Sequence, residues 1–124
     1  MFVFSIAVPD YKITAKLYKM KEVNVHELKK MMDDQEEFQL IDVREPREHE
    51  YCNIGGELIP MGTILNRINQ IDKDKKVVIY CRSGNRSANV VKALEQKYDF
   101  GNLYNLKGGI LDWSDQIDPT VPKY

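Results

Sequence analysis

The stretch of sequence that decides the fold is Val77-Val78-Ile79-Tyr80-Cys81-Arg82-Ser83-Gly84-Asn85-Arg86-Ser87-Ala88. Its first four residues form an unbroken apolar run, which is typical of a central parallel strand covered on both faces. From about Ser87 to Tyr98, the spacing of Ala88, Val91 and Leu94 predicts a helix with one apolar side. A short turn therefore joins a buried strand to a helix, as in α/β domains.

Segments on both sides of this stretch alternate between strand and helix patterns. Asn24 and Glu27 have the spacing of a capping box, and Pro46 suits the first turn of a helix. We predict further strands at 38–43, 57–60 and 103–106, and helices at 24–34, 46–51, 64–71 and after Gly108-Gly109. This alternation predicts an α/β fold with three layers, in which helices flank a mainly parallel central sheet.

Length and composition indicate one folded domain. The chain has 124 residues, of which 43% are hydrophobic and 30% charged, so it can build a core without disulfide or metal staples. We assign residues 22–124 to the domain and residues 1–21 to an N-terminal extension. Within the extension, Phe2 to Val8 is either a strand or an extended arm.

Charge and cysteine content exclude several classes of function. The net charge is −1 with both signs interleaved, which argues against a nucleic-acid partner. The two cysteines, Cys52 and Cys81, are too few for a disulfide framework and lack zinc-ligand spacing, so no metal site is expected. The apolar start lacks a basic leader and is too short to cross a bilayer, so we expect a cytoplasmic protein without a membrane partner.

Cys81 is the candidate nucleophile. It follows a central strand and precedes a helix, which is where ligands bind in open α/β sheets. Gly84 allows the turn to curl its amides inward, and the helix terminus, Arg82 and Arg86 all favour the thiolate. Ser87 can donate its hydroxyl to the sulfur or cap the helix. A cysteine alone at a strand end is usually an inert buried thiol, but this concentration of cationic and amide groups favours a reactive one.

Three segments resemble the motifs of the rhodanese-like sulfurtransferases. Residues 81–87 are similar to that family's active-site loop, Asp42-Val43-Arg44-Glu45-Pro46-Arg47-Glu48 to its "DVREPxE" segment, and Gly108-Gly109-Ile110-Leu111-Asp112-Trp113 to its closing signature. The motifs occur in the family's order, and the likeness covers roughly residues 22–113. It implies a rhodanese-like domain.

The resemblance also implies a chemistry, which is thiosulfate-type sulfur transfer through a Cys81 persulfide with ping-pong kinetics. Arg82 and Arg86 would orient a small anionic sulfur donor, and the main-chain amides from Ser83 through Gly84 and Asn85 to Ser87 would hold the persulfide. No metal or organic cofactor is needed. A sulfur-carrier or other acceptor protein would be the partner, because residues 53–60 and the tail 113–124 are similar to the rhodanese domain of sulfur-carrier adenylyltransferases.

Several residues near these motifs have two interpretations. Asp42 either polarises the loop or, as we prefer, caps the helix at Pro46, while Arg44 and Glu48 are expected to form a structural ion pair that supports the site. Cys52 is either a resolving thiol for Cys81 or, as we prefer, a partly buried structural thiol. His26 and His49 show no ligand spacing and no nearby partner motif, so we expect both to lie on the surface. We expect Trp113 to anchor the core.

Two other functions use related features. Cysteine-dependent phosphatases and arsenate reductases resemble this loop but have five residues between cysteine and arginine, whereas four separate Cys81 from Arg86. Non-catalytic binding modules of the rhodanese fold commonly lack the loop cysteine. The sequence therefore favours a sulfurtransferase, with a persulfide carrier or protein-binding module as the alternative.

Overall fold

The computed structural model describes residues 18–124, in which five parallel strands form one sheet. The strands are β1 (Glu22–Val23), β2 (Phe38–Asp42), β3 (Glu57–Leu58), β4 (Lys76–Tyr80) and β5 (Leu103–Leu106). Their order is β1-β5-β4-β2-β3, so β4 is the central strand, as its apolar run predicts. The strand or arm predicted within Phe2–Val8, and the extension up to residue 17, lie outside the described residues.

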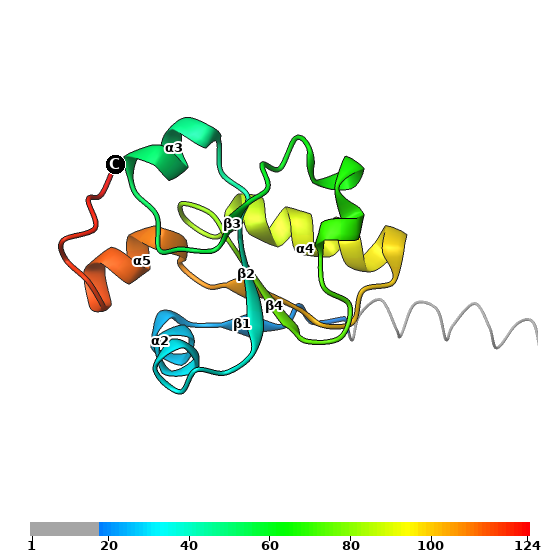
Figure 1. Ribbon diagram of the computed structural model, residues 1–124, viewed down its shortest axis with the longest axis horizontal. Coiled ribbons are helices and arrows are strands. Elements are labelled where there is room, and N and C mark those ends of the chain that lie inside the picture. Colours follow the sequence, from blue (N-terminus) through cyan, green and yellow to red (C-terminus); the bar gives the residue numbers. More distant parts are fainter. Residues whose placement is uncertain (1–17) are drawn as a thin grey trace, which may run out of the picture.

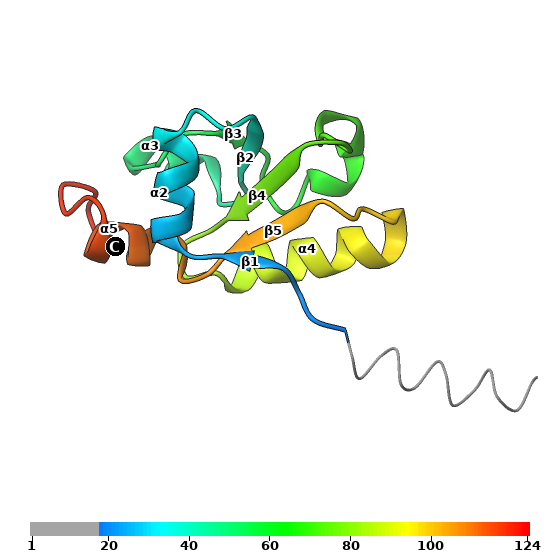
Figure 2. The same cartoon turned by 90° about the horizontal axis from the view of Figure 1, so that it is seen from below.

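Helices cover both faces of the sheet and produce the three predicted layers (Figures 1 and 2). Helices α2 (Val25–Asp33) and α5 (Gly109–Gln116) lie on one face, and α4 (Asn85–Tyr98) lies on the other. The short helix α3 (Pro46–Tyr51) follows the carboxyl end of β2. The predicted capping box is confirmed at α2, because Asn24 and the side chain of Glu27 each accept the other's backbone amide.

The alternation of side chains along β4 divides the core into two clusters. Val77 and Ile79 point toward α4 and pack with Val91 and Leu94. Val78 and Tyr80 point the other way, toward α2 and α5, where Leu28, Ile110 and Trp113 surround them. Both faces of the strand are thus buried, which explains why its sequence is apolar without alternation. Trp113 is 7% exposed, in agreement with its predicted role in the core.

Two of the predicted helices differ in the structure. The helix predicted over residues 64–71 is instead two single 3-10 turns, η1 (Ile64–Asn66) and η2 (Ile68–Gln70). Arg67 between them leaves the helical region, at φ −129° and ψ 30°, and no side chain caps the segment at Thr63. Helix α4 begins at Asn85, two residues before the predicted start, because Gly84 takes a left-handed conformation at φ 103° and serves as its N-cap.

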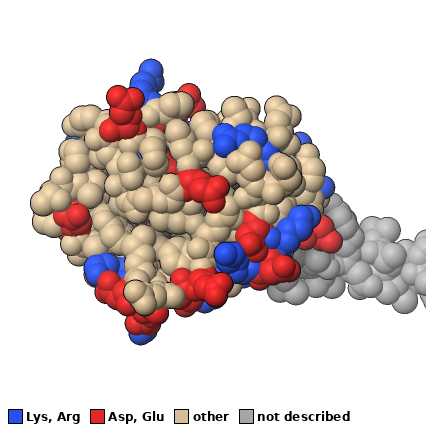
Figure 3. All heavy atoms as spheres, viewed as in Figure 1, with Lys and Arg blue, Asp and Glu red and all other residues tan. Residues whose placement is uncertain are grey.

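Charged side chains of both signs lie side by side on the face shown in Figure 3. Within residues 18–124, no helix combines the length and apolar character that a membrane crossing requires.

Candidate functional site

Cys81 lies at the carboxyl end of β4, where its sulfur faces the start of α4. The Sγ atom accepts hydrogen bonds from the Gly84 amide at 3.1 Å and from the Ser87 amide at 3.4 Å. The hydroxyl of Ser87 is 3.3 Å from the same sulfur. The Cys81 residue is 1% exposed, so these donors surround the sulfur in a largely dry environment. Two amides at a helix N-terminus stabilise negative charge on the atom that they face.

The first turn of α5 holds the backbone of this loop from behind. The amides of Ile110 and Leu111 donate to the carbonyl oxygens of Cys81 (2.9 Å) and Arg82 (3.1 Å), respectively. Gly109 makes this approach possible, because its φ is +61° and an added Cβ would lie 2.4 Å from the Arg82 oxygen. The second glycine of the closing motif is therefore required by the contact between α5 and the cysteine loop, whereas a Cβ on Gly108 would meet the Asp112 side chain.

Ser87 is oriented by Asn105, a buried residue of β5 that sequence reasoning did not identify. The Asn105 amide nitrogen donates to the Gly84 carbonyl at 3.2 Å, and its Oδ1 atom is 2.5 Å from the Ser87 hydroxyl. With Asn105 turned this way, its Oδ1, the Gly84 carbonyl and Sγ of Cys81 compete for the one hydroxyl hydrogen of Ser87. The only sequence signal for Asn105 is a polar residue within an otherwise apolar strand.

The side chain of Arg86 is directed toward α3, where it pairs with Glu48. Its two terminal nitrogens donate to the two carboxylate oxygens at 2.8 and 2.9 Å. The hydrogen bond from Arg86 is the main reason that the pKa of Glu48 falls to about 2. The same hydrogen bond raises the pKa of Arg86. Both groups are therefore charged throughout the neutral range, and Glu48 balances the positive charge that Arg86 brings to the loop.

The predicted ion pair between Arg44 and Glu48 is wrong. The two residues are four positions apart, but Arg44 precedes α3 rather than lying within it, so they do not share a helix face. The buried Arg44 side chain folds back to Asp42, to which Nε and Nη2 donate at 2.9 and 2.7 Å. Burial opposes charge on Arg44, but the hydrogen bonds with Asp42 and Tyr124 prevail and its pKa is raised.

Two further predictions around α3 are corrected by the same contacts. Asp42 does not cap the helix, because Glu45 is the N-cap, with a capping box to Glu48. Instead Asp42 accepts from Arg44 and lies 2.8 Å from the Nδ1 atom of His49, which was expected to have no partner. His49 lies one turn into α3, so its side chain is close to Asp42 at the end of β2, the strand that precedes this helix. His26 is exposed as predicted, although its ring contacts Gln116.

Of the remaining loop residues, Arg82 contacts a tyrosine that was not predicted as a site residue. The side chains of Ser83 and Asn85 are exposed, and Arg82 is half-buried. Tyr124 lies beside Arg82 with 5.1 Å between the guanidinium carbon and the ring centre. The tail was singled out by its resemblance alone, and nothing in its sequence indicates that it returns to this loop.

Cys52 lies in a different part of the core from Cys81. It is 9% exposed and belongs to the cluster beneath α2 and α5, whereas Cys81 belongs to the cluster beneath α4. Its thiol lies 3.8 Å from the Pro122 carbonyl, and its own carbonyl accepts from Arg44. Both thiols are free. This placement supports the structural interpretation of Cys52.

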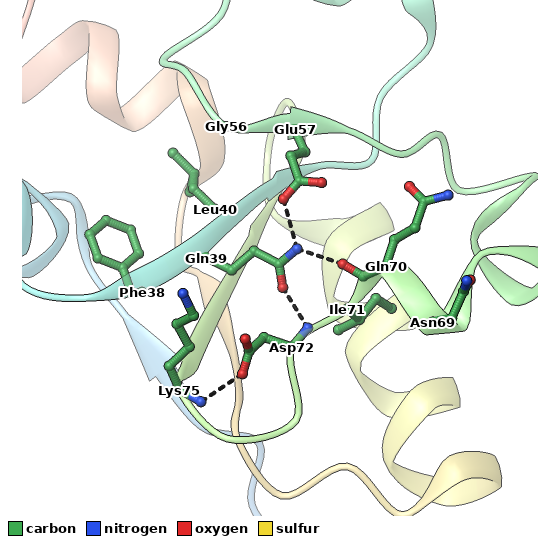
Figure 4. Close-up of a pocket in the computed structure, with 10 residues that line it drawn as sticks. All are labelled: Phe38, Gln39, Leu40, Gly56, Glu57, Asn69, Gln70, Ile71, Asp72 and Lys75. Carbon is green, nitrogen blue, oxygen red and sulfur yellow. Dashed lines mark hydrogen bonds between the residues drawn. The ribbon is translucent and has the colours of Figure 1, made fainter.

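A hollow of about 510 Å³ lies at the opposite end of the sheet from Cys81 (Figure 4). Gln39 crosses it, donating to Glu57 (2.8 Å) and to the Gln70 carbonyl (2.7 Å), and accepting from the Asp72 amide (2.7 Å). These contacts satisfy the side-chain amide of Gln39 within the protein. Gln39 therefore has a structural role at this hollow. The Cys81 sulfur, its hydrogen-bond donors and the ion pair of Arg86 with Glu48 lie instead at the carboxyl ends of the strands.

Comparison with known proteins agrees with this geometry. The family model described as "Rhodanese-like domain" matches residues 24–116. A sulfurtransferase of Allochromatium vinosum is 38% identical over 103 residues, which cover 82% of this chain and 95% of that protein. The probable adenylyltransferase/sulfurtransferase MoeZ of Mycobacterium tuberculosis is 33% identical over 89% of this chain, but the match spans 29% of MoeZ. The crystal structure of a rhodanese-like domain protein from Staphylococcus aureus superposes with a TM-score of 0.71 at 33% identity, covering 79% of this chain and 95% of that one.

Proposed function

This chain belongs to the rhodanese-like domain family, among whose members are sulfurtransferases, and we propose that it transfers sulfane sulfur through a persulfide on Cys81. The observation that carries the proposal is the group of donors around the sulfur: the Gly84 amide, the Ser87 amide and the Ser87 hydroxyl. A persulfide places its charge on the sulfur beyond Sγ, and amides directed toward Sγ support both the attacking thiolate and the loaded form.

The proposed reaction has two displacements. The Cys81 thiolate attacks the outer sulfur of an anionic donor such as thiosulfate, the donor's S–S bond breaks, and sulfite leaves with the electron pair. A thiophilic acceptor such as cyanide or a thiolate then attacks the outer sulfur of Cys81–S–S⁻. The bond to Sγ breaks, and the Cys81 thiolate is restored. Since the donor product leaves before the acceptor reacts, the kinetics are ping-pong.

The loop residues have separate roles in this scheme. Arg82 and Arg86 orient the anionic donor, and the amides of residues 83–87 hold the transferred sulfur. Asp42 and Arg44 support the site from below: their buried ion pair fixes the turn that follows β2, next to the loop that follows β4. Arg86 pairs with Glu48. Arg82, the other arginine of the loop, pairs with no carboxylate within residues 18–124.

The acceptor is proposed to be a sulfur-carrier protein. Support comes from the similarity to MoeZ, whose printed description combines an adenylyltransferase with a sulfurtransferase. In this version the chain is a persulfide carrier that passes sulfur to a protein partner, and cyanide only substitutes for that partner in the assay.

Mass spectrometry of the intact protein after incubation with thiosulfate tests the proposal. We expect the mass to increase by one sulfur atom, the added sulfur to be removed by cyanide, and peptide mapping to assign it to Cys81. The Cys81→Ser variant serves as the control and should stay unmodified. A wild-type protein that gains no sulfur from thiosulfate or from a small-molecule persulfide would refute the proposed function.

A further inference from the structure

We propose that Tyr124 is a positioning residue for the sulfur-transfer site, whose ring holds Arg82 in the orientation that receives an anionic donor. This inference rests on the proposed function, but one of its tests does not require sulfur transfer. The ring centre of Tyr124 lies 5.1 Å from the guanidinium carbon of Arg82, within the range of a cation–π contact.

The segment that carries Tyr124 is fixed along its length. Figure 1 shows the chain beyond α5 turning back toward α3. The Ser114 hydroxyl donates to the Val121 carbonyl at 2.5 Å, and the Pro122 carbonyl faces the Cys52 thiol. Ile117, Val121 and Tyr124 all pack against the cluster beneath α2 and α5. The ring of Tyr124 is therefore held against the domain by several independent contacts.

The hydroxyl of Tyr124 fixes the ring from its other end. It accepts a hydrogen bond from Nη1 of Arg44 at 2.7 Å and donates one to Oε2 of Glu48 at 2.7 Å. These two residues are the partners of Asp42 and Arg86, so the hydroxyl joins the two ion pairs at the carboxyl end of the sheet. The ring of Tyr51 meets that of Tyr124 edge to face at 5.9 Å.

Arg82 depends on this ring more than the other two arginines do. Arg44 is held by Asp42 and Arg86 by Glu48, both through charged hydrogen bonds. Within residues 18–124, Arg82 has no carboxylate partner, and the aromatic ring that it contacts is that of Tyr124. A long side chain without a fixed partner samples many rotamers, so removing the ring would disperse the positive charge next to Cys81.

Alkylation of Cys81 by reagents that differ in charge tests the orientation of Arg82 directly. The Cys81 thiolate attacks the carbon of either iodoacetate or iodoacetamide and displaces iodide, but only iodoacetate is an anion. The ratio of their rates at Cys81 therefore reports the local positive charge and cancels changes in thiol acidity. The rates are measured by peptide mass spectrometry in a Cys52→Ser background.

The variants separate the ring from the hydroxyl. Tyr124→Leu removes the ring, and we expect the rate ratio to fall about fivefold, the size of a partly exposed cation–π contact. Tyr124→Phe keeps the ring and should retain most of the ratio. Arg82→Gln should lower the ratio as Tyr124→Leu does. In the Arg82→Gln background, Tyr124→Leu should change nothing further, because the two residues act through one contact.

Steady-state kinetics give the second measurement. Tyr124→Leu should raise the KM for thiosulfate about fivefold, with a smaller effect on kcat. Tyr124→Phe, which keeps the ring, should have a KM near that of the wild type. A wild-type rate ratio in Tyr124→Leu, with Arg82→Gln reducing it, would overturn the positioning role. Absence of sulfur transfer in the wild-type protein would instead refute the proposed function and leave the alkylation test to decide the role of Tyr124.

Discussion

The carboxylate of Glu48 grips the guanidinium of Arg86 with both oxygens, at 2.8 and 2.9 Å, and so ties α3 to the first turn of α4. The contact spans 38 positions of sequence and joins the "DVREPxE" segment to the cysteine loop. Planar, bidentate pairs of this kind have a defined geometry as well as charge complementarity. Glu48 thereby holds the Arg86 side chain and, through it, the first turn of α4.

The ion pair between Glu48 and Arg86 predicts an acid-dependent loss of stability. The hydrogen bond from Arg86 lowers the pKa of Glu48 from 4.5 to about 2, so the ionised carboxylate stabilises the fold above pH 4.5. That stabilisation is lost as the pH falls toward 2. Urea unfolding across this range should show a steeper loss for the wild type than for Glu48→Gln. Parallel slopes for the two proteins would contradict the assignment.

The two cysteines should differ in their importance for catalysis. Cys81→Ser should abolish sulfur transfer from thiosulfate to cyanide, because serine offers no sulfur to carry the persulfide. Cys52→Ser should retain most of the activity, since Cys52 packs in the opposite cluster. Circular dichroism serves as the folding control for both variants. Equal losses in two folded variants would place Cys52 in the mechanism.

The contact between Ser87 and Asn105 predicts a coupled effect on turnover. Ser87→Ala removes the hydroxyl next to Sγ and should lower kcat/KM about tenfold, as expected for a hydrogen bond to a charged group. Asn105→Ala should also reduce kcat/KM, because Ser87 loses the contact at 2.5 Å that orients its side chain beside Sγ. The double variant should be no worse than the more damaging of the two single variants. Additive losses would show that the residues act independently.

The size of the cysteine loop predicts selectivity for sulfur over phosphorus. The Gly84 and Ser87 amides approach Sγ itself, at 3.1 and 3.4 Å, and the proposed persulfide adds only one atom beyond that sulfur. A phosphoryl group must place three equatorial oxygens among such donors and needs a wider cradle. The protein should therefore show no measurable hydrolysis of aryl phosphates by Cys81. Faster turnover of an aryl phosphate than of thiosulfate would reject the sulfur-transfer assignment.

The sequence predicted those features that depend on local patterns. The central position of β4 follows from its apolar run, and the capping box at α2 from two residues three apart. The short helix α3 follows from a proline at its first position. The segment 64–71 was predicted incorrectly because isoleucines at helical spacing also suit two short turns that pack on the same face of a sheet.

The contacts of the candidate site were harder to predict because they join distant segments. Arg44 and Glu48 are four positions apart, but α3 begins between them. Arg44 therefore pairs with Asp42, and Glu48 pairs with Arg86. Asn105 of β5 contacts Ser87, 18 positions away, and Tyr124 of the tail contacts Glu48 of α3, 76 positions away. No local pattern encodes such pairings.

The separation of the two thiols by the central sheet has a consequence for the fate of bound sulfur. A disulfide needs Cβ atoms that point toward each other, and the Cys52 and Cys81 side chains pack in clusters on opposite faces of the sheet. The sheet thus insulates Cys81 from the second thiol of its own chain. Under the proposed mechanism, Cys52 is therefore not placed to take up the outer sulfur of a Cys81 persulfide, and release of that sulfur requires a second molecule.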